Sequence, residues 1–242
     1  MSFRLPDKTK RLTITGRTGS GKTVFGAWVL SEANFDEMPW VIMDFKGDEL
    51  LGSIEYVKDL VVTDHIPHEP GLYRMKPDPV AEDDINEFMF RIWRTGSVGL
   101  FIDETYMVPN PLKRNGLKAV LTQGRALHIP VIALSQRPSG VNRHVFSEAD
   151  MFCSYHLNDK KDRERVGELT PDDEVWNQDA RLPDFHSRWY DVGYNWSAIL
   201  KPVPNPEKIL QRFRSRLEPP KETVDNTGQS DLQQGQRKKV II

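Results

Sequence analysis

The segment Gly16-Arg-Thr-Gly-Ser-Gly-Lys-Thr23 is the feature that most limits the folds open to this chain of 242 residues. It follows a β-branched run, Leu12–Thr15, and precedes the apolar, helix-forming run Val24–Leu30. It therefore matches the G-x-x-x-x-G-K-[ST] pattern in its strand-loop-helix context. Glycines in such a loop let successive backbone N–H groups turn inward around phosphate oxygens, and the helix presents its positive end to the same anion. The sequence predicts a phosphate-binding loop (P-loop) over residues 16–23.

Two side chains of the P-loop have predicted roles of their own. The Lys22 ammonium group is expected to reach the β- and γ-phosphates of a nucleotide, and the Thr23 hydroxyl is expected to ligate Mg²⁺. We therefore predict ATP and Mg²⁺ as the cofactors of this chain. The predicted nucleotide-binding residues are the whole loop: Gly16, Arg17, Thr18, Gly19, Ser20, Gly21, Lys22 and Thr23.

A second, acidic motif completes such a site. A Mg²⁺ ion beside phosphates needs a carboxylate, usually at the end of an apolar strand, and Val98-Gly-Leu-Phe-Ile-Asp-Glu104 supplies one. Asp103 is predicted to be the metal-associated carboxylate. Glu104 is expected to point elsewhere and to polarise a water molecule for in-line attack on the γ-phosphate. An Asp-Glu pair is more typical of ATP-hydrolysing machines than of kinases, so we predict an ATPase.

The chain alternates short β-branched runs with longer helical patterns, which indicates βαβ units. The predicted strands cover 12–15, 40–45, 60–63, 98–103, 130–135 and 151–155, and the predicted helices cover 22–33, 83–95, 112–127 and 159–168. A hairpin formed by 186–192 and 197–201 and a last helix over 206–217 follow. The predicted fold class is α/β, with a mostly parallel central sheet flanked by helices.

One domain and a tail account for this organisation. No internal repeat of roughly 20 to 50 residues is visible, so residues 1–217 are predicted to form a single ATPase domain. Residues 218–242 are rich in Pro, Gln, Asp, Thr and Gly. Such a segment cannot bury enough apolar surface to offset its ordering entropy, and we predict a disordered tail.

Charge and cysteine content argue against several other classes of protein. Lys and Arg number 33 against 35 Asp and Glu, a net charge of −2, which argues against binding nucleic acid by bulk positive charge. The single Cys153 excludes an intramolecular disulfide framework, and the lack of Cys/His clusters excludes a structural zinc module. A polar, basic start and apolar runs of only about five residues predict no secretory signal and no membrane insertion.

Two further motifs make the pattern specific. One predicted strand ends in Asp44-Phe-Lys-Gly-Asp-Glu49 and another in Ser135-Gln136. A polar Gln136 at the tip of the strand after the Asp-Glu strand can sense the γ-phosphate. In their order, the motifs resemble the HerA–FtsK superfamily of DNA-pumping P-loop ATPases: the P-loop, Asp44–Glu49, Asp103-Glu104, Gly124-Arg125 and Ser135-Gln136. The small size is most similar to that of the genome-packaging ATPases of internal-membrane icosahedral phages and viruses.

This resemblance, which covers roughly residues 10–205, implies a RecA-like motor domain that hydrolyses ATP between the subunits of a ring. We expect a hexameric ring that threads double-stranded DNA and docks on capsid vertex or portal proteins, in the host cytoplasm and at the packaging vertex of the virion. Gln136 matches the family's γ-phosphate sensor. An arginine from the neighbouring subunit completes the family's site; we assign it to Arg125, with Arg137 and Arg143 as alternatives. No His follows Arg125, unlike in many relatives.

Several basic segments could contact DNA phosphates without reading bases. On the predicted helix over 112–127, a cationic stripe would be formed by Arg114, Lys118, Thr122 and Arg125. The loop over 110–116 is the preferred pore element. Two other basic clusters are Lys160, Lys161, Arg163 and Arg165, and Arg212, Arg214 and Arg216.

Two other functions share the P-loop. A phosphotransferase would need an acceptor or lid motif, and the sequence shows none. A nucleotide-gated phage assembly or morphogenesis factor would bind nucleotide without translocating DNA. The leading hypothesis is an ATP-driven translocase of double-stranded DNA that packages a viral genome into a preformed capsid.

Overall fold

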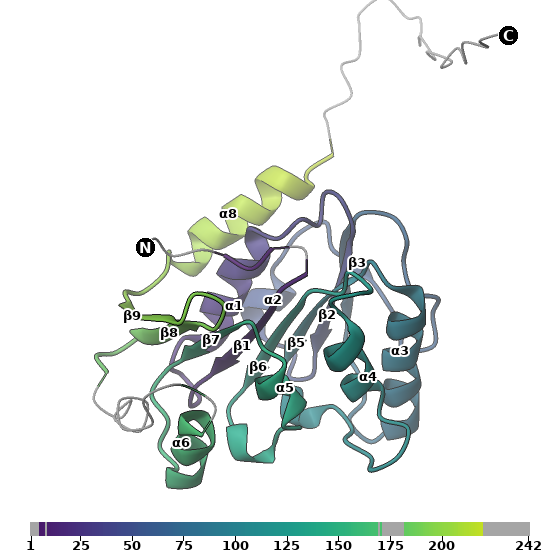
Figure 1. The fold of residues 1–242 in the computed structure, drawn as a ribbon. Helices are drawn as coiled ribbons and strands as arrows, with labels where there is room; N and C mark the ends of the chain where they lie inside the picture. The colour runs from purple at the N-terminus through teal and green to yellow at the C-terminus, as the bar shows by residue number, and fades with distance from the viewer. Residues whose placement is uncertain (1–4, 8, 169, 171–181, 220–242) are drawn as a thin grey trace, which may run out of the picture.

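The computed structural model describes residues 5–7, 9–168, 170 and 182–219. These residues form a nine-stranded sheet with the strand order β3-β4-β2-β5-β6-β1-β7-β8-β9, and helices cover both of its faces (Figure 1). The pairs from β3 to β7 are parallel, and only the pairs β7–β8 and β8–β9 are antiparallel. The predicted α/β fold with a C-terminal hairpin and helix is confirmed.

The strands are short and most are fully buried. Their bounds are β1 Arg11–Thr15, β2 Pro39–Asp44, β3 Lys58–Asp59, β4 Gly71–Met75, β5 Gly99–Asp103, β6 Val131–Ser135, β7 Met151–Ser154, β8 Ser187–Asp191 and β9 Trp196–Leu200. The helices are α1 Lys22–Ser31, α2 Glu49–Gly52, α3 Glu82–Thr95, α4 Gly116–Gln123, α5 His144–Ser147, α6 Lys160–Gly167 and α8 Pro206–Leu217, with short 3₁₀ turns η1 Thr105–Met107 and η2 Pro138–Gly140.

Two cores lie on the two faces of the sheet, because successive side chains of a strand point to opposite faces. In β2, Val41 and Met43 belong to the core beneath α3, α4 and α5, whereas Trp40 and Ile42 belong to the core beneath α1, α2 and α8. Both cores are continuous from one strand to the next. The sheet is therefore a rigid layer that fixes the positions of the loops at its edges.

The structure corrects one predicted strand. Residues 60–63 are not a strand: the Asp64 carboxylate accepts a hydrogen bond from the Val61 N–H at 2.7 Å and closes a turn there. The strand that pairs with β2 in this region is β4, whose sequence Gly-Leu-Tyr-Arg-Met gives no clear apolar run. The β3 strand beside it has only two residues, Lys58 and Asp59.

The helix predicted over 112–127 is also shorter than expected. It begins only after Asn115, whose side chain accepts a hydrogen bond from the Lys118 N–H at 2.8 Å. It ends at Gly124, whose carbonyl accepts from the Ile129 N–H at 2.8 Å, and His128 has a left-handed φ of 53°. Arg114 and Arg125 therefore lie outside the helix, and the predicted four-residue cationic stripe is wrong.

The C-terminal prediction is covered only in part. Helix α8 ends at Leu217, where the sequence places the end of the domain. The disordered tail predicted over 218–242 falls almost wholly outside the described residues. The domain boundary itself remains a prediction.

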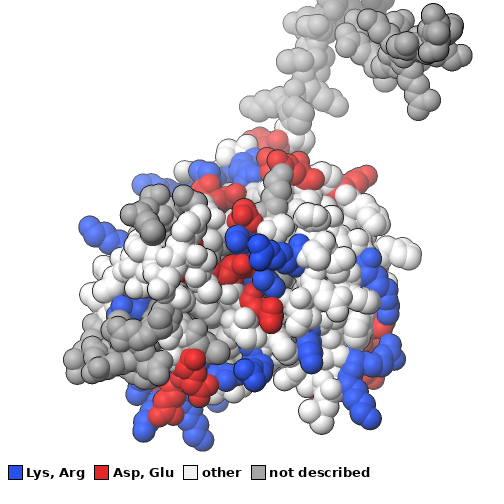
Figure 2. Space-filling model, in the orientation of Figure 1, with Lys and Arg blue, Asp and Glu red and all other residues white. Residues whose placement is uncertain are grey.

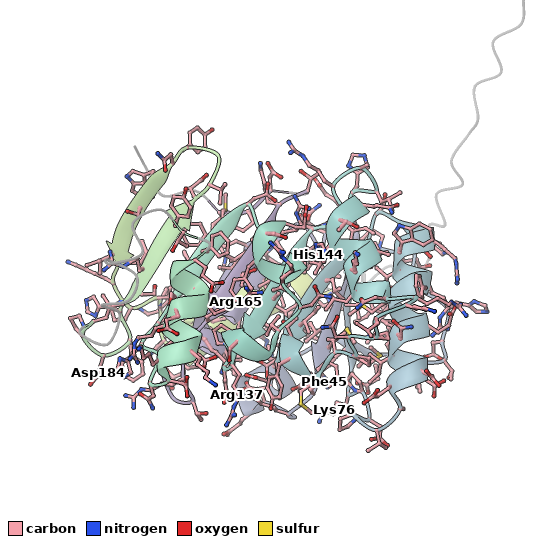
Figure 3. The ribbon with its side chains drawn as sticks, turned by 60° about the horizontal axis from the view of Figure 1, so that its bottom comes forward. Phe45, Lys76, Arg137, His144, Arg165 and Asp184 are labelled. Carbon is pink, nitrogen blue, oxygen red and sulfur yellow. The ribbon has the colours of Figure 1, made fainter. Side chains whose placement is uncertain are left out.

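Seven parallel strands, from β3 to β7 in the sheet order, end at one edge of the sheet, and the predicted site residues lie at the ends of β1, β2, β5 and β6. Thr15 pairs with Ser135, and Asp44 pairs with Asp103, so these strands end level with one another. Figure 3 shows this edge from the side: Phe45, Lys76 and Arg137, which follow β2, β4 and β6, lie along it. Ligands of open α/β sheets bind at the carboxyl ends of the strands, and we therefore examined this edge for a site.

Candidate nucleotide-binding site

The P-loop begins between two neighbouring strands that hold it in place. The Gly16 N–H donates to the Ser135 carbonyl at 3.2 Å and the Arg17 N–H donates to the His156 carbonyl at 3.0 Å. A Cβ on Gly16 would lie 2.5 Å from Ser20 Oγ, and Gly19 and Gly21 have left-handed φ angles of 77° and 95°. Glycine is thus required at these positions by space or by backbone conformation. Lys22 is the first residue of α1, so the loop leads directly into the helix N-terminus.

Thr23, in the first turn of α1, and Asp103, at the end of β5, lie close together at this edge of the sheet. The Thr23 hydroxyl lies 3.5 Å from Asp103 Oδ1, and the other oxygen, Oδ2, is buried without a hydrogen-bond partner. Burial, the largest cause, raises the pKa of Asp103 to about 6, although Lys46 and Lys22 lower it. A buried carboxylate that lacks partners is costly, and this one is adjacent to the phosphate loop.

Glu104 is fully buried and is held by two lysines. Its Oε1 lies 3.2 Å from Lys22 Nζ and 2.5 Å from Lys46 Nζ. Both contacts are ion pairs. Glu104 has φ 66°, a left-handed conformation that is uncommon outside glycine and that here follows the last residue of β5. The backbone turn separates the Glu104 side chain from that of Asp103, as the sequence predicts.

Gln136 lies against both the P-loop and Glu104. Its side-chain Oε1 accepts a hydrogen bond from the Thr18 hydroxyl at 2.7 Å, and its backbone N–H lies 3.4 Å from Glu104 Oε2. Gln136 follows the last residue of β6. The structure therefore brings together the P-loop, Asp103, Glu104 and Gln136, and their catalytic roles remain predictions.

Two residues of this edge, Asp44 and Lys46, were given no role from the sequence. Asp44 ends β2 beside Asp103, and its Oδ2 is buried without a hydrogen-bond partner. Its Oδ1 accepts from the Asp48 N–H at 3.0 Å. The motif Asp44–Glu49 was the signal, because polar residues directly after a buried strand lie at the sheet edge where ligands bind.

An apolar cleft opens beside the end of the P-loop. It has a volume of 390 Å³ and is lined by Gly21, Val24, Tyr155, Phe185 and the segment 202–206. Phe185 is 56% exposed with a left-handed φ of 58°, and a Cβ on Gly21 would lie 3.2 Å from its ring. An exposed aromatic ring over an apolar cleft is suited to a planar, partly apolar group such as a nucleobase.

A comparison with known proteins agrees with this geometry. The DNA packaging ATPase P9 of Enterobacteria phage PRD1 is 38% identical over 220 residues, which are 88% of this chain and 96% of P9. The chain belongs to this family of DNA-packaging ATPases. No family model matches the sequence. The predicted membership of the P-loop packaging ATPases is confirmed.

Solved structures align with the fold of this chain. The genome packaging NTPase B204 of Sulfolobus turreted icosahedral virus 2, in complex with AMPPCP, aligns with a TM-score of 0.63 at 17% identity, over 82% of this chain and all of B204. The conjugation coupling protein TcpA of pCW3, with ATPγS, aligns with a TM-score of 0.51 at 16% identity, over 84% of this chain and 65% of TcpA. At these identities the likeness concerns the fold alone.

The side chains of this packaging ATPase fit a Mg²⁺ ion. Hydroxyl and carboxylate oxygens are the ligands that Mg²⁺ prefers, and Thr23 and Asp103 present both, with Asp103 Oδ2 still unpartnered. No group of three or more His, Cys, Asp or Glu able to hold a metal occurs in the described part of the chain. A Mg²⁺ ion would therefore take its remaining ligands from phosphates and water, as is usual for this ion.

The three candidate arginines of the packaging ATPase lie in different places. Arg125 is exposed in the turn before β6, at the opposite edge of the sheet from the P-loop, so it could reach a nucleotide only in another subunit. Arg137 is exposed directly after Gln136, at the P-loop edge. Arg143 is exposed and precedes α5. The structure thus leaves Arg125 as a candidate in trans and Arg137 as a candidate in cis.

The other basic clusters of the packaging ATPase are largely paired. Lys160 and Arg165 form ion pairs with Glu164 at 3.4 Å and Glu168 at 3.1 Å, and basic and acidic side chains are interspersed over α6 in Figure 2. Arg114, in the predicted pore loop, is the more exposed cation: its side chain is 80% exposed, and its one ion pair among the described residues is the long one to Glu87 at 3.9 Å. Among the described residues, no helix is long and apolar enough to span a bilayer.

Proposed function

We propose that this chain hydrolyses ATP to move double-stranded DNA into a preformed viral capsid. The observation that carries the proposal is the 38% identity to a DNA packaging ATPase over nearly the whole length of both chains. The juxtaposition of the P-loop with Asp103 and Glu104 supports ATP hydrolysis as the energy source. The near-balanced net charge of −2 suits a motor that must let DNA slide.

ATP binding would use both parts of the site. The P-loop backbone and Lys22 would hold the phosphates, because left-handed glycines and a helix N-terminus direct N–H groups at an anion. The apolar cleft under Phe185 would take the base, since it adjoins Gly21 and Val24 at the exit of the loop. Thr23 and Asp103 would hold Mg²⁺, which when bound would neutralise charge on the phosphates.

Hydrolysis would use Glu104 as the general base. Its carboxylate would accept a proton from water while the water oxygen bonds to the γ-phosphorus and the bond to the β–γ bridging oxygen breaks. Gln136, which contacts both Thr18 and Glu104 directly after β6, would sense the γ-phosphate. The backbone turn at Glu104 separates the Asp103 side chain from that of the base, so Asp103 would act only on the metal side.

The assembled motor would be a ring, which we expect to be a hexamer, with DNA in its centre. Each site would be completed by an arginine from the neighbouring subunit. We assign this role to Arg125, because Arg125 cannot reach the P-loop of its own subunit. The ring would dock on vertex or portal proteins of the capsid and work in the host cytoplasm and at the packaging vertex. Arg114 and the loop around it are the favoured DNA contact, since this cation is exposed.

The test is phosphate release measured with and without linear double-stranded DNA, over a range of salt and protein concentrations. We expect stimulation that rises cooperatively with protein and falls with salt, because phosphate contacts release counterions. Glu104→Gln should lower the turnover rate by about 10² to 10³ while leaving nucleotide binding intact. Unchanged turnover in this variant would refute the assigned base.

Nucleotide binding without turnover under every DNA condition would instead favour a nucleotide-gated assembly factor. Phosphate transferred stoichiometrically to an acceptor would favour a phosphotransferase. A flat response to DNA with normal ATP hydrolysis would refute the DNA-engaged ring but keep the ATPase.

A further inference from the structure

The turn after β2 places a second lysine in the nucleotide site. Asp44 Oδ1 accepts a hydrogen bond from the Asp48 N–H at 3.0 Å, and the intervening Gly47 has a left-handed φ of 68°. The Asp48 carboxylate in turn accepts from the Leu50 and Leu51 N–H groups at the start of α2. Both ends of the turn are thus tied down, and Lys46 between them extends toward Glu104.

Lys46 and Lys22 approach the same carboxylate oxygen. Their Nζ atoms lie 2.5 Å and 3.2 Å from Glu104 Oε1. The Glu104 side chain is 0% exposed, whereas that of Lys46 is 35% exposed, so Lys46 stands between Glu104 and the solvent. One buried negative charge therefore has two positive partners.

Nucleotide binding would leave Glu104 with only one of these two lysines as a partner. A P-loop lysine pairs with the β- and γ-phosphates, and a triphosphate is a stronger attractor than one carboxylate, so Lys22 would leave Glu104. A buried carboxylate that loses its only cation carries an uncompensated charge, which is strongly unfavourable. With Lys46 in place, Glu104 keeps a partner when Lys22 is withdrawn.

We propose that Lys46 is a positioning residue that keeps the Glu104 carboxylate paired when nucleotide takes Lys22. This inference rests on the proposed nucleotide site and assigns to Asp44-Phe-Lys46 a role in it. It makes Lys46 a partner of the base and not a ligand of the phosphates. It also explains why a second lysine is needed beside a P-loop that already has one.

The test is a double-mutant cycle read out as binding of AMPPCP with Mg²⁺ to the full chain. Lys46→Met should weaken AMPPCP binding about tenfold or more with Glu104 present, because binding would leave that buried carboxylate without a positive partner. In the Glu104→Gln background, where no charge needs a partner, the same change should cost less than about threefold. Lys46→Arg should restore binding to within about threefold of the unmodified chain, because it keeps the positive charge.

Lys76→Met is the matched control. Lys76 lies near the same turn, with its Nζ 3.9 Å from where a Cβ on Gly47 would be, but its side chain is exposed at the edge of the sheet (Figure 3). This variant should bind AMPPCP as the unmodified chain does. Thermal unfolding without nucleotide should be nearly unchanged in Lys46→Met, since Lys22 then still pairs with Glu104.

Three outcomes would overturn the proposal. Equal losses in the two backgrounds would make Lys46 a direct phosphate ligand. Full binding by Lys46→Met would leave it no role, and a large loss of thermal stability without nucleotide would make it a structural residue. If the unmodified chain itself did not bind AMPPCP, the proposed function would fail, and this inference, which rests on it, would fail with it.

Discussion

Charged residues gather at two regions of this molecule, the P-loop edge of the sheet and the outer surface of α8, and they are satisfied differently. At the P-loop edge, Asp44 Oδ2 and Asp103 Oδ2 are buried without a hydrogen-bond partner. On α8, which lies across the top of the molecule in Figure 1, each arginine has an acidic partner: Arg212 with Glu32, Arg214 with Glu55 at 3.6 Å, and Arg216 with Asp36 at 2.8 Å.

The difference separates a site from a surface. Buried polar atoms are nearly always hydrogen-bonded in folded proteins, so unpartnered ones call for an explanation such as an unseen ligand. Exposed ion pairs on a helix need no further partner and contribute little to the free energy of unfolding. In the sequence both regions are simply charge-rich. Of these two regions the P-loop edge is the incomplete one, because it holds buried carboxylate oxygens without a hydrogen-bond partner.

The largest expected effect concerns an arginine that belongs to neither region. Arg125→Ala should lower DNA-stimulated ATP turnover by about 10³, because an arginine in trans stabilises transition-state charge, and should leave AMPPCP binding unchanged. The measurement is steady-state phosphate release at protein concentrations where the chain assembles, with Arg137→Ala and Arg143→Ala made in parallel. If only Arg137→Ala lost turnover, the site would be completed in cis, and the P-loop edge would be less incomplete than the comparison implies.

The loss of stability caused by the unpartnered buried carboxylates at the P-loop edge can be measured through Asp103. Its pKa is raised from 3.8 to about 6 by burial, so the folded state holds a proton more tightly than the unfolded state does. Stability from this group is therefore fully present below pH 3.8 and is lost as the pH rises through about 6. In the absence of Mg²⁺ and nucleotide, Asp103→Asn should be more stable than the unmodified chain by up to about 3 kcal/mol at pH 7.5.

Urea unfolding at two pH values checks this prediction. The stability difference between Asp103→Asn and the unmodified chain should fall to roughly half at pH 5, where the folded-state carboxyl is mostly protonated. A difference that did not change with pH would mean that the substitution acts through packing. A destabilised Asn variant at pH 7.5 would show that the carboxylate already has adequate partners.

The base cleft offers a third way to sharpen the comparison. Phe185→Ala should weaken AMPPCP binding by about tenfold, because truncating an aromatic side chain over a ligand costs on the order of 1 kcal/mol or more. Binding of inorganic tripolyphosphate, which has no base, should not change. Calorimetric titration of both ligands decides the matter: equal losses would mean that Phe185 supports the P-loop through Gly21 instead of contacting a base.

The parts of the fold that local sequence determines were predictable. The strands β5 and β6 are apolar runs that are buried on both faces, and β1 is a β-branched run. The P-loop is defined by glycines, two of which have a backbone conformation that no other residue adopts easily. The prediction of a strand over 60–63 is wrong because a turn that Asp64 caps interrupts these apolar residues. The β4 strand was missed because its place beside β2 depends on pairing, which a single segment does not record.

The features of the site also fall into those that local sequence predicts and those that depend on the folded chain. Lys22, Asp103 and Glu104 follow from motifs, whereas the pairing of Lys46 with Glu104 joins residues 58 positions apart and exists only in the folded chain. The later start of α4 could have been found, because Asn115 is a favoured N-cap residue. The position of Arg125 at the edge of the sheet opposite the P-loop could not be found in this way, because it depends on how the strands are arranged in the sheet.

The smallest expected effect tests whether the α8 surface is complete. Arg214 and Glu55 form an ion pair in which both side chains are 54% exposed, and such pairs contribute at most about 1 kcal/mol. Arg214→Gln should change the free energy of unfolding by less than about 0.5 kcal/mol and leave DNA-stimulated turnover and its salt dependence unaltered. The same assay applied to Arg114→Gln, in the exposed pore loop, serves as the contrast and should reduce the DNA stimulation. A shallower salt dependence in Arg214→Gln would mean that this arginine exchanges Glu55 for a DNA phosphate, and the α8 surface would then be a second incomplete region.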